Sequence, residues 1–116
     1  MILLDEPTSG LDSFTAIKIC KVLQKLAHEQ GKTIVSTIHQ PSSTAFATFD
    51  RLILMADGHI VYQGPAKESA AHFAKLDNRE ARRFGNPADT FMRILTVNYP
   101  KTKKDEANIS NWINMY

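Results

Sequence analysis

Blocks of apolar and polar residues follow one another along the chain in an order that predicts alternating strands and helices. Four apolar residues, 1–4, run without interruption and stop at two adjacent carboxylates, Asp5 and Glu6. A short run of this kind is typical of a strand that is buried on both faces of a parallel sheet. Pro7 cannot extend a sheet ladder, so we expect this strand to end by Glu6.

The next two blocks predict a helix and a second strand. Apolar residues recur at helical spacing over 14–28, Asp12 or Ser13 can cap the start of this helix, and Gly31 can end it. The stretch 33–38 is rich in β-branched residues, which favours a strand. A strand, a helix and a strand over this length predict a right-handed βαβ unit with parallel strands.

The middle of the chain predicts shorter elements. A short helix is expected over 42–49, and two strands are expected over 51–56 and 59–63. The dipeptide Asp57-Gly58 between the two strands is a strong hairpin signal. A helix is expected to follow over 65–76, because proline is tolerated in the first turn of a helix.

The last third of the chain predicts one more helix and a polar tail. Asn86 followed by proline and an acidic residue is typical of a helix start, so we expect a helix to about Thr96. The residues after Pro100 are mostly polar and charged. We therefore expect 97–116 to be a linker, with a weak amphipathic turn around 109–113.

The residues at the ends of the first two predicted strands carry the candidate chemistry. Asp5 and Glu6 would lie at the carboxyl end of their strand, where open α/β sheets hold their ligands. His39 ends the second strand, so parallel pairing would bring it to the same edge. This pattern favours a magnesium–nucleotide site in which Asp5 faces the metal and Glu6 polarises an attacking water, with His39 on a phosphate or that water. The alternative is a strand that ends in two solvated acids, with a structural histidine beside it.

Composition and charge restrict the class of protein without identifying it. The 116 residues are 43% hydrophobic and 22% charged, which is ordinary for a globular domain. The net charge of +2 is too small to argue for a nucleic-acid partner. The single cysteine, Cys20, excludes an internal disulfide framework. The longest apolar run, 52–56, is far shorter than a membrane helix.

Three stretches of the chain resemble one protein family. Residues 3–12, Leu-Leu-Asp-Glu-Pro-Thr-Ser-Gly-Leu-Asp, resemble the Walker B strand and D-loop of an ATP-binding-cassette (ABC) ATPase. Residues 36–43 and 86–91 are similar to stretches found in the G subfamily of ABC transporters. The resemblance implies an α/β fold, the C-terminal portion of a P-loop NTPase domain over residues 1–96. It also implies that 97–116 leads towards a transmembrane domain.

The resemblance implies a role for each matching residue. Asp5 would hold Mg²⁺, Glu6 would be the general base, and His39 would contact the γ-phosphate of ATP. A second cassette, in a homodimer or a heterodimer, would pack against the D-loop, which also belongs to the nucleotide site. The residues at this interface would be Ser9, Gly10, Leu11 and Asp12, and all of them except Leu11 would also belong to the nucleotide site.

The resemblance also implies a function for the whole protein. Cassettes of this subfamily hydrolyse ATP at the cytoplasmic face of a membrane and drive lipids, sterols or hydrophobic compounds across it. The alternatives are a portion of an ABC ATPase that does not serve transport, or a non-enzymatic interaction module.

Some of the family's motifs do not occur in this sequence. These are the Gly-x-x-x-x-Gly-Lys-Ser/Thr phosphate loop, the Leu-Ser-Gly-Gly signature and the glutamine loop. We therefore expect this polypeptide alone neither to bind ATP tightly nor to hydrolyse it. Such a chain would be a fragment or a mis-started gene product of a transporter, or a genuine short product. Because its first strand would lack its usual neighbours, we expect an exposed sheet edge and an exposed apolar face.

Overall fold

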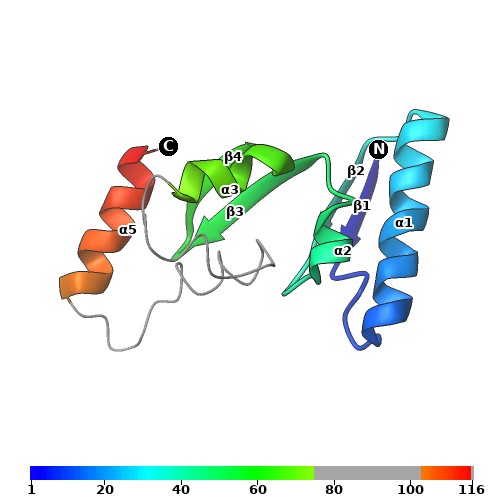
Figure 1. Ribbon diagram of the computed structural model, residues 1–116, viewed down its shortest axis with the longest axis horizontal. Coiled ribbons are helices and arrows are strands. Elements are labelled where there is room, and N and C mark those ends of the chain that lie inside the picture. The colour runs from blue at the N-terminus through cyan, green and yellow to red at the C-terminus, as the bar shows by residue number, and fades with distance from the viewer. Residues whose placement is uncertain (75–102, 116) are drawn as a thin grey trace. The chain divides into compact units, whose positions relative to one another are not determined.

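The computed structural model describes residues 1–74 and 103–115, and the chain divides into two units, Met1–Phe49 and Asp50–Tyr116. In the first unit, strands β1 (Ile2–Asp5) and β2 (Ile34–Thr37) form a parallel pair. Helix α1 (Ser13–Gln30) connects them and lies on one side of the pair (Figure 1). The parallel strand–helix–strand unit that the sequence predicted is therefore confirmed.

Local signals fix both ends of α1. Asp12 is its N-cap, and the Asp12 carboxylate accepts hydrogen bonds from the Thr15 amide (3.1 Å) and the Thr15 hydroxyl (2.6 Å). Gly31 ends the helix with a φ of +62°, in the left-handed region that favours glycine. Of the two residues that the sequence offered as a cap, the structure selects Asp12 over Ser13.

The buried side chains of the first unit lie between α1 and the short helix α2 (Ser43–Phe46), which are in contact. Ser42 caps α2 through its hydroxyl, so the helix is shorter than the expected 42–49. Cys20 of α1 is buried, and burial raises the pKa of its thiol. Cys20 is therefore a buried packing residue of this unit.

The β1–β2 pair is half-covered. Ile2 and Leu4 are half-buried, whereas Leu3 on the opposite face is 68% exposed. Its register partner on β2, Val35, is 49% exposed. The uninterrupted apolar run predicted burial on both faces, and that prediction is wrong for the strand in this structure. The expected exposed apolar face is present.

The second unit is built on an antiparallel hairpin of β3 (Arg51–Ala56) and β4 (His59–Pro65). The turn consists of Asp57 and Gly58, both with positive φ, which confirms the predicted two-residue hairpin. β4 is two residues longer than expected, because Pro65 still pairs with Arg51 at the open end of the hairpin. Pro65 therefore ends the strand, and the prediction that it lies in the first turn of a helix is wrong.

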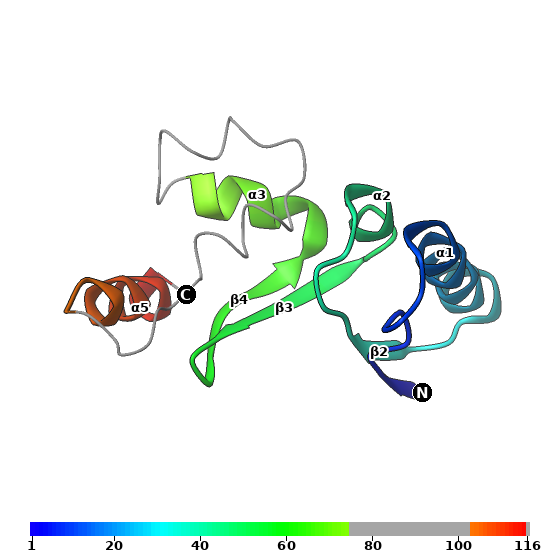
Figure 2. The same ribbon diagram turned by 90° about the horizontal axis from the view of Figure 1, so that it is seen from below.

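Two helices pack against this hairpin. Helix α3 (Ala66–Ala74) contacts both strands and lies beside the hairpin in Figure 2. Helix α5 (Lys103–Met115) contacts β4. The fully buried residues include Val61 of β4 and Phe73 of α3. A linker with a weak amphipathic turn was expected at the C-terminus, but the structure has a 13-residue helix there. Ile109, which is 7% exposed, gives this polar helix an apolar contact residue.

Two expected features fall on residues that the structure does not describe. These are the helix expected to about Thr96 and the end of the helix expected over 65–76. Both stay predictions.

Candidate functional site

The carboxyl ends of β1 and β2 coincide. Asp5, the last residue of β1, is paired with Thr37, the last residue of β2, in a parallel register. Glu6 directly follows β1, and His39 lies two residues beyond β2. The structure therefore confirms that these residues, far apart in the sequence, meet at one edge of the sheet.

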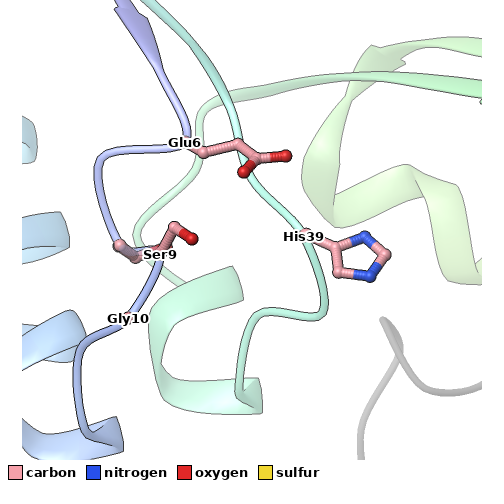
Figure 3. Close-up of a pocket in the computed structure, with 5 residues that line it drawn as sticks. Glu6, Ser9, Gly10 and His39 are labelled. Atoms are coloured by element: carbon pink, nitrogen blue, oxygen red, sulfur yellow. The ribbon is translucent and has the colours of Figure 1, made fainter.

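Glu6 and His39 line the same pocket. Its volume is about 240 Å³, and it is open to solvent. Figure 3 shows Glu6 extending from the end of β1 towards the segment that carries His39, with Ser9 and Gly10 on the loop that follows. Thr8 completes the lining. Four of the candidate residues, Glu6, Ser9, Gly10 and His39, are thus gathered at one concave site.

Asp5 lies next to this pocket and does not line it. The Thr37 hydroxyl donates a hydrogen bond of 2.7 Å to Oδ1 of Asp5. The same hydroxyl accepts a hydrogen bond of 2.8 Å from the backbone N–H of Glu6. The two adjacent acids therefore differ in environment: the Asp5 carboxylate is tied to β2, and the Glu6 side chain belongs to the pocket.

The loop after β1 is a series of tight turns. The Ser9 amide donates to the Glu6 carbonyl (3.0 Å), and the Leu11 amide donates to the Thr8 carbonyl (3.3 Å). Gly10 has a φ of +73°, and the main chain could turn this way at another residue only with strain. These turns bring Ser9 and Gly10 back beside Glu6, which is why the loop contributes to the pocket lining.

Asp12, the last candidate of this loop, is not among the residues that line the pocket. Its carboxylate caps α1 instead. The hydrogen bond from the Thr15 hydroxyl, followed by that from the Thr15 amide, lowers the pKa of the Asp12 carboxyl below its usual value. Its assignment to the nucleotide site stays a prediction, and so does the place of Asp12 and Leu11 at the interface with a second cassette.

The backbone at both strand ends adopts an unusual conformation. Among the described residues, the non-glycine positions with positive φ are Glu6 (46°), Gln40 (48°) and Asp57 in the hairpin turn. Left-handed backbone is uncommon for residues other than glycine and is concentrated at functional sites. Glu6 and Gln40, which follows His39, adopt it at the candidate site. No sequence signal marked these two positions.

The donor atoms at this edge suit Mg²⁺, which is commonly held by one or two carboxylates together with water and substrate phosphates. Asp5 supplies such a carboxylate. The described residues contain no group of three or more His, Cys, Asp or Glu side chains that could hold a metal ion. A Mg²⁺ site of this kind does not require such a group, because water and substrate phosphates supply the other ligands.

Sequence reasoning missed two residues of the site. Thr8 lines the pocket, and Thr37 bonds to Asp5 and Glu6. Thr37 was seen only as a β-branched strand residue. Its place opposite Asp5 follows from the strand register, which no local sequence pattern specifies.

Comparison with known proteins gives the class of protein to which this chain belongs. A family model described as "ABC-2 type transporter" matches residues 39–113. An uncharacterised ABC transporter ATP-binding protein/permease of Saccharomyces cerevisiae is 44% identical over 112 residues, 96% of this chain and 8% of that protein. Protein white of Drosophila melanogaster is 43% identical over 84% of this chain and 14% of its own length. ABC transporter G family member 26 of Arabidopsis thaliana is 50% identical over 66% of this chain and 11% of its own length.

The chain belongs to the ABC-2 type transporter family, and G-family ABC transporters are among its relatives. It spans between 8% and 14% of the length of the three relatives named above. The matched family is the membrane domain of these transporters, and of the candidate site residues its match includes only His39. Within the part of the chain that the structure describes, no helix is both long enough and apolar enough to cross a membrane.

Proposed function

We propose that residues 1–96 are the C-terminal portion of the nucleotide-binding domain of a G-subfamily ABC transporter, with the α/β fold of a P-loop NTPase. The observation that carries this proposal is the pocket lined by Glu6 and His39 at the carboxyl edge of a parallel strand pair. This edge is where open α/β sheets bind their ligands. The yeast relative is named an ATP-binding protein/permease, which supports ATP as the ligand.

Each residue of the site has one task in this proposal. Glu6 is the general base: its carboxylate takes a proton from water while the water oxygen attacks the γ-phosphorus of ATP, and ADP leaves. His39 contacts the γ-phosphate from the other side of the pocket. Asp5 would hold Mg²⁺, which would neutralise charge on the phosphates.

The remaining site residues and the parent protein complete the proposal. A second cassette, in a homodimer or a heterodimer, packs against the loop residues Ser9, Gly10, Leu11 and Asp12. The parent transporter lies in a membrane, with this portion at the cytoplasmic face. ATP hydrolysis drives lipids, sterols or other hydrophobic compounds across that membrane. Because the phosphate loop does not occur in these 116 residues, the isolated polypeptide is not expected to bind ATP with micromolar affinity, which calorimetry can test.

A chimera tests the catalytic part of the proposal. The 112 aligned residues of this chain replace their counterparts in the full-length yeast relative, and ATP binding and hydrolysis are measured on the purified protein. Glu6→Gln is expected to lower turnover by roughly 100-fold or more, the contribution of a general base, and to retain ATP binding. Glu29→Gln is the matched control, since Glu29 is an exposed residue of α1 in an ion pair with Lys25 (3.8 Å). Unchanged turnover in Glu6→Gln would refute Glu6 as the base.

A further inference from the structure

Thr37 is the residue through which β2 contacts both acids at the end of β1. Its hydroxyl oxygen lies 2.7 Å from Oδ1 of Asp5 and 2.8 Å from the backbone nitrogen of Glu6. The Glu6 amide can only donate, so it bonds to a lone pair of the hydroxyl. The single hydroxyl proton is then directed to the Asp5 carboxylate. One side chain thus makes two bonds of defined direction across the strand pair.

The bond to Asp5 limits how that carboxylate can be oriented. Asp5 and Thr37 are register partners, so the bond joins directly opposed residues. It occupies Oδ1 of the carboxylate. The bond therefore limits rotation of the Asp5 carboxylate, which is the group that would hold Mg²⁺.

The bond to Glu6 acts on the main chain. Glu6 has a φ of 46°, a left-handed conformation that is energetically unfavourable for residues other than glycine. The Thr37 hydroxyl gives the Glu6 amide a partner where the strand ladder has ended. The direction in which the chain leaves β1 depends on this conformation, and so does the entry of the Glu6 side chain into the pocket.

We propose that Thr37 is a positioning residue of the ATPase site, which sets the Asp5 carboxylate for the metal and the Glu6 backbone for general-base catalysis. This inference rests on the function proposed above. Thr37 itself does not line the pocket and acts through the two acids.

Two substitutions separate this role from a purely structural one. Thr37→Val keeps the β-branched shape, which suits a strand, and removes the hydroxyl. Thr37→Ser keeps the hydroxyl and loses the methyl group that favours a strand. If Thr37 mattered only as a strand residue, valine would be the milder change. If its hydroxyl positions the acids, serine is the milder change.

The first measurement uses the full 116-residue chain and NMR spectroscopy. Three-bond couplings report whether the Asp5 side chain occupies one χ1 rotamer, and amide exchange reports the protection of Glu6. The wild type and Thr37→Ser are expected to show one rotamer and a protected amide. Thr37→Val is expected to show rotamer averaging and about 10-fold faster Glu6 exchange, the size of one hydrogen bond. Rotamer averaging in the wild type would refute the inference without any variant, even if Thr37→Val failed to fold.

The second measurement uses the chimera with the yeast relative. Thr37→Val is expected to lower kcat about 10-fold and to change KM for ATP less than about twofold, because the affected interactions act on the reacting groups. Thr37→Ser should stay within about twofold of the unsubstituted chimera in both constants. Equal loss in both variants, or none in Thr37→Val, would overturn the inference. The proposed function is judged separately by Glu6→Gln, and the NMR comparison does not depend on that result.

Discussion

Leu3 and Val35 are direct register partners across the parallel pair, and both side chains lie on its exposed face. Two exposed apolar residues side by side on a two-stranded sheet favour self-association. The unpaired backbone groups at the strand edges favour it as well. Replacing these two side chains with less apolar ones should therefore lower self-association of the chain without disturbing its core.

The double substitution Leu3→Thr/Val35→Thr is expected to lower self-association, because threonine keeps the strand preference and removes apolar surface. Light scattering and size-exclusion chromatography measure the effect. Leu4→Thr is the matched control: Leu4 is half-buried on the other face, so this change should lower the free energy of unfolding by about 1–2 kcal/mol.

The wild-type chain is expected to melt in a shallow, weakly cooperative transition, because one face of its first sheet is uncovered. Circular dichroism measures the melt. A sharp two-state transition above roughly 60 °C in a monomeric sample would contradict this expectation.

Gly31 supports a prediction about backbone conformation. It ends α1 with a φ of +62°, and a Cβ atom added there would meet nothing within 4 Å. Gly31→Ala should therefore cost about 1–2 kcal/mol from the left-handed backbone alone. Gly31→Asn should cost less, because asparagine tolerates this region. Urea unfolding gives both values, and equal stability of the alanine variant and the wild type would contradict the argument.

The cap of α1 predicts a pH dependence. Hydrogen bonds from Thr15 lower the pKa of Asp12 in the folded state. The stabilisation is thus fully present above the unfolded-state pKa of about 4 and is lost as the pH falls through the lower, folded-state pKa. The free energy of unfolding of the wild type should therefore be lower at acidic pH than at pH 6. This decrease should be smaller in Asp12→Asn, because asparagine keeps a capping side chain but carries no charge. Thr15→Val should also reduce the drop, and an unchanged profile in both variants would argue against this cause.

Gly64 and Tyr62 on β4 predict a non-additive pair. A Cβ atom on Gly64 would lie 2.9 Å from the Tyr62 hydroxyl oxygen, which itself donates a hydrogen bond to the Pro65 carbonyl (2.7 Å). Gly64→Ala should cost about 1–3 kcal/mol by crowding, and Tyr62→Phe about 0.5–1.5 kcal/mol through the lost hydrogen bond. The double variant should cost less than the sum, because the crowded oxygen is gone. A double-mutant cycle measures this, and simple additivity would rule out the hydroxyl as the point of conflict.

Much of the local structure was readable from the chain because its causes are local. The cap at Asp12, the stop at Gly31 and the hairpin turn at Asp57-Gly58 each depend on a few neighbouring residues. The shared edge of Glu6 and His39 also followed, since strands joined by one helix pair in parallel. Strand geometry alone brings their carboxyl ends together.

Other features depended on residues distant in sequence, and only the tertiary structure decided them. The length of β4, the packing of Ile109 and the exposure of Leu3 are set by what each element meets in space. The Thr37 hydroxyl bonds to Asp5 and Glu6 because of the register of two strands, which no local pattern specifies. The sequence by itself thus determined the strand–helix–strand unit, the hairpin, and the edge at which the acids and the histidine gather. The register of β1 and β2, and the burial of each face of this pair, determined how the side chains at that edge are held.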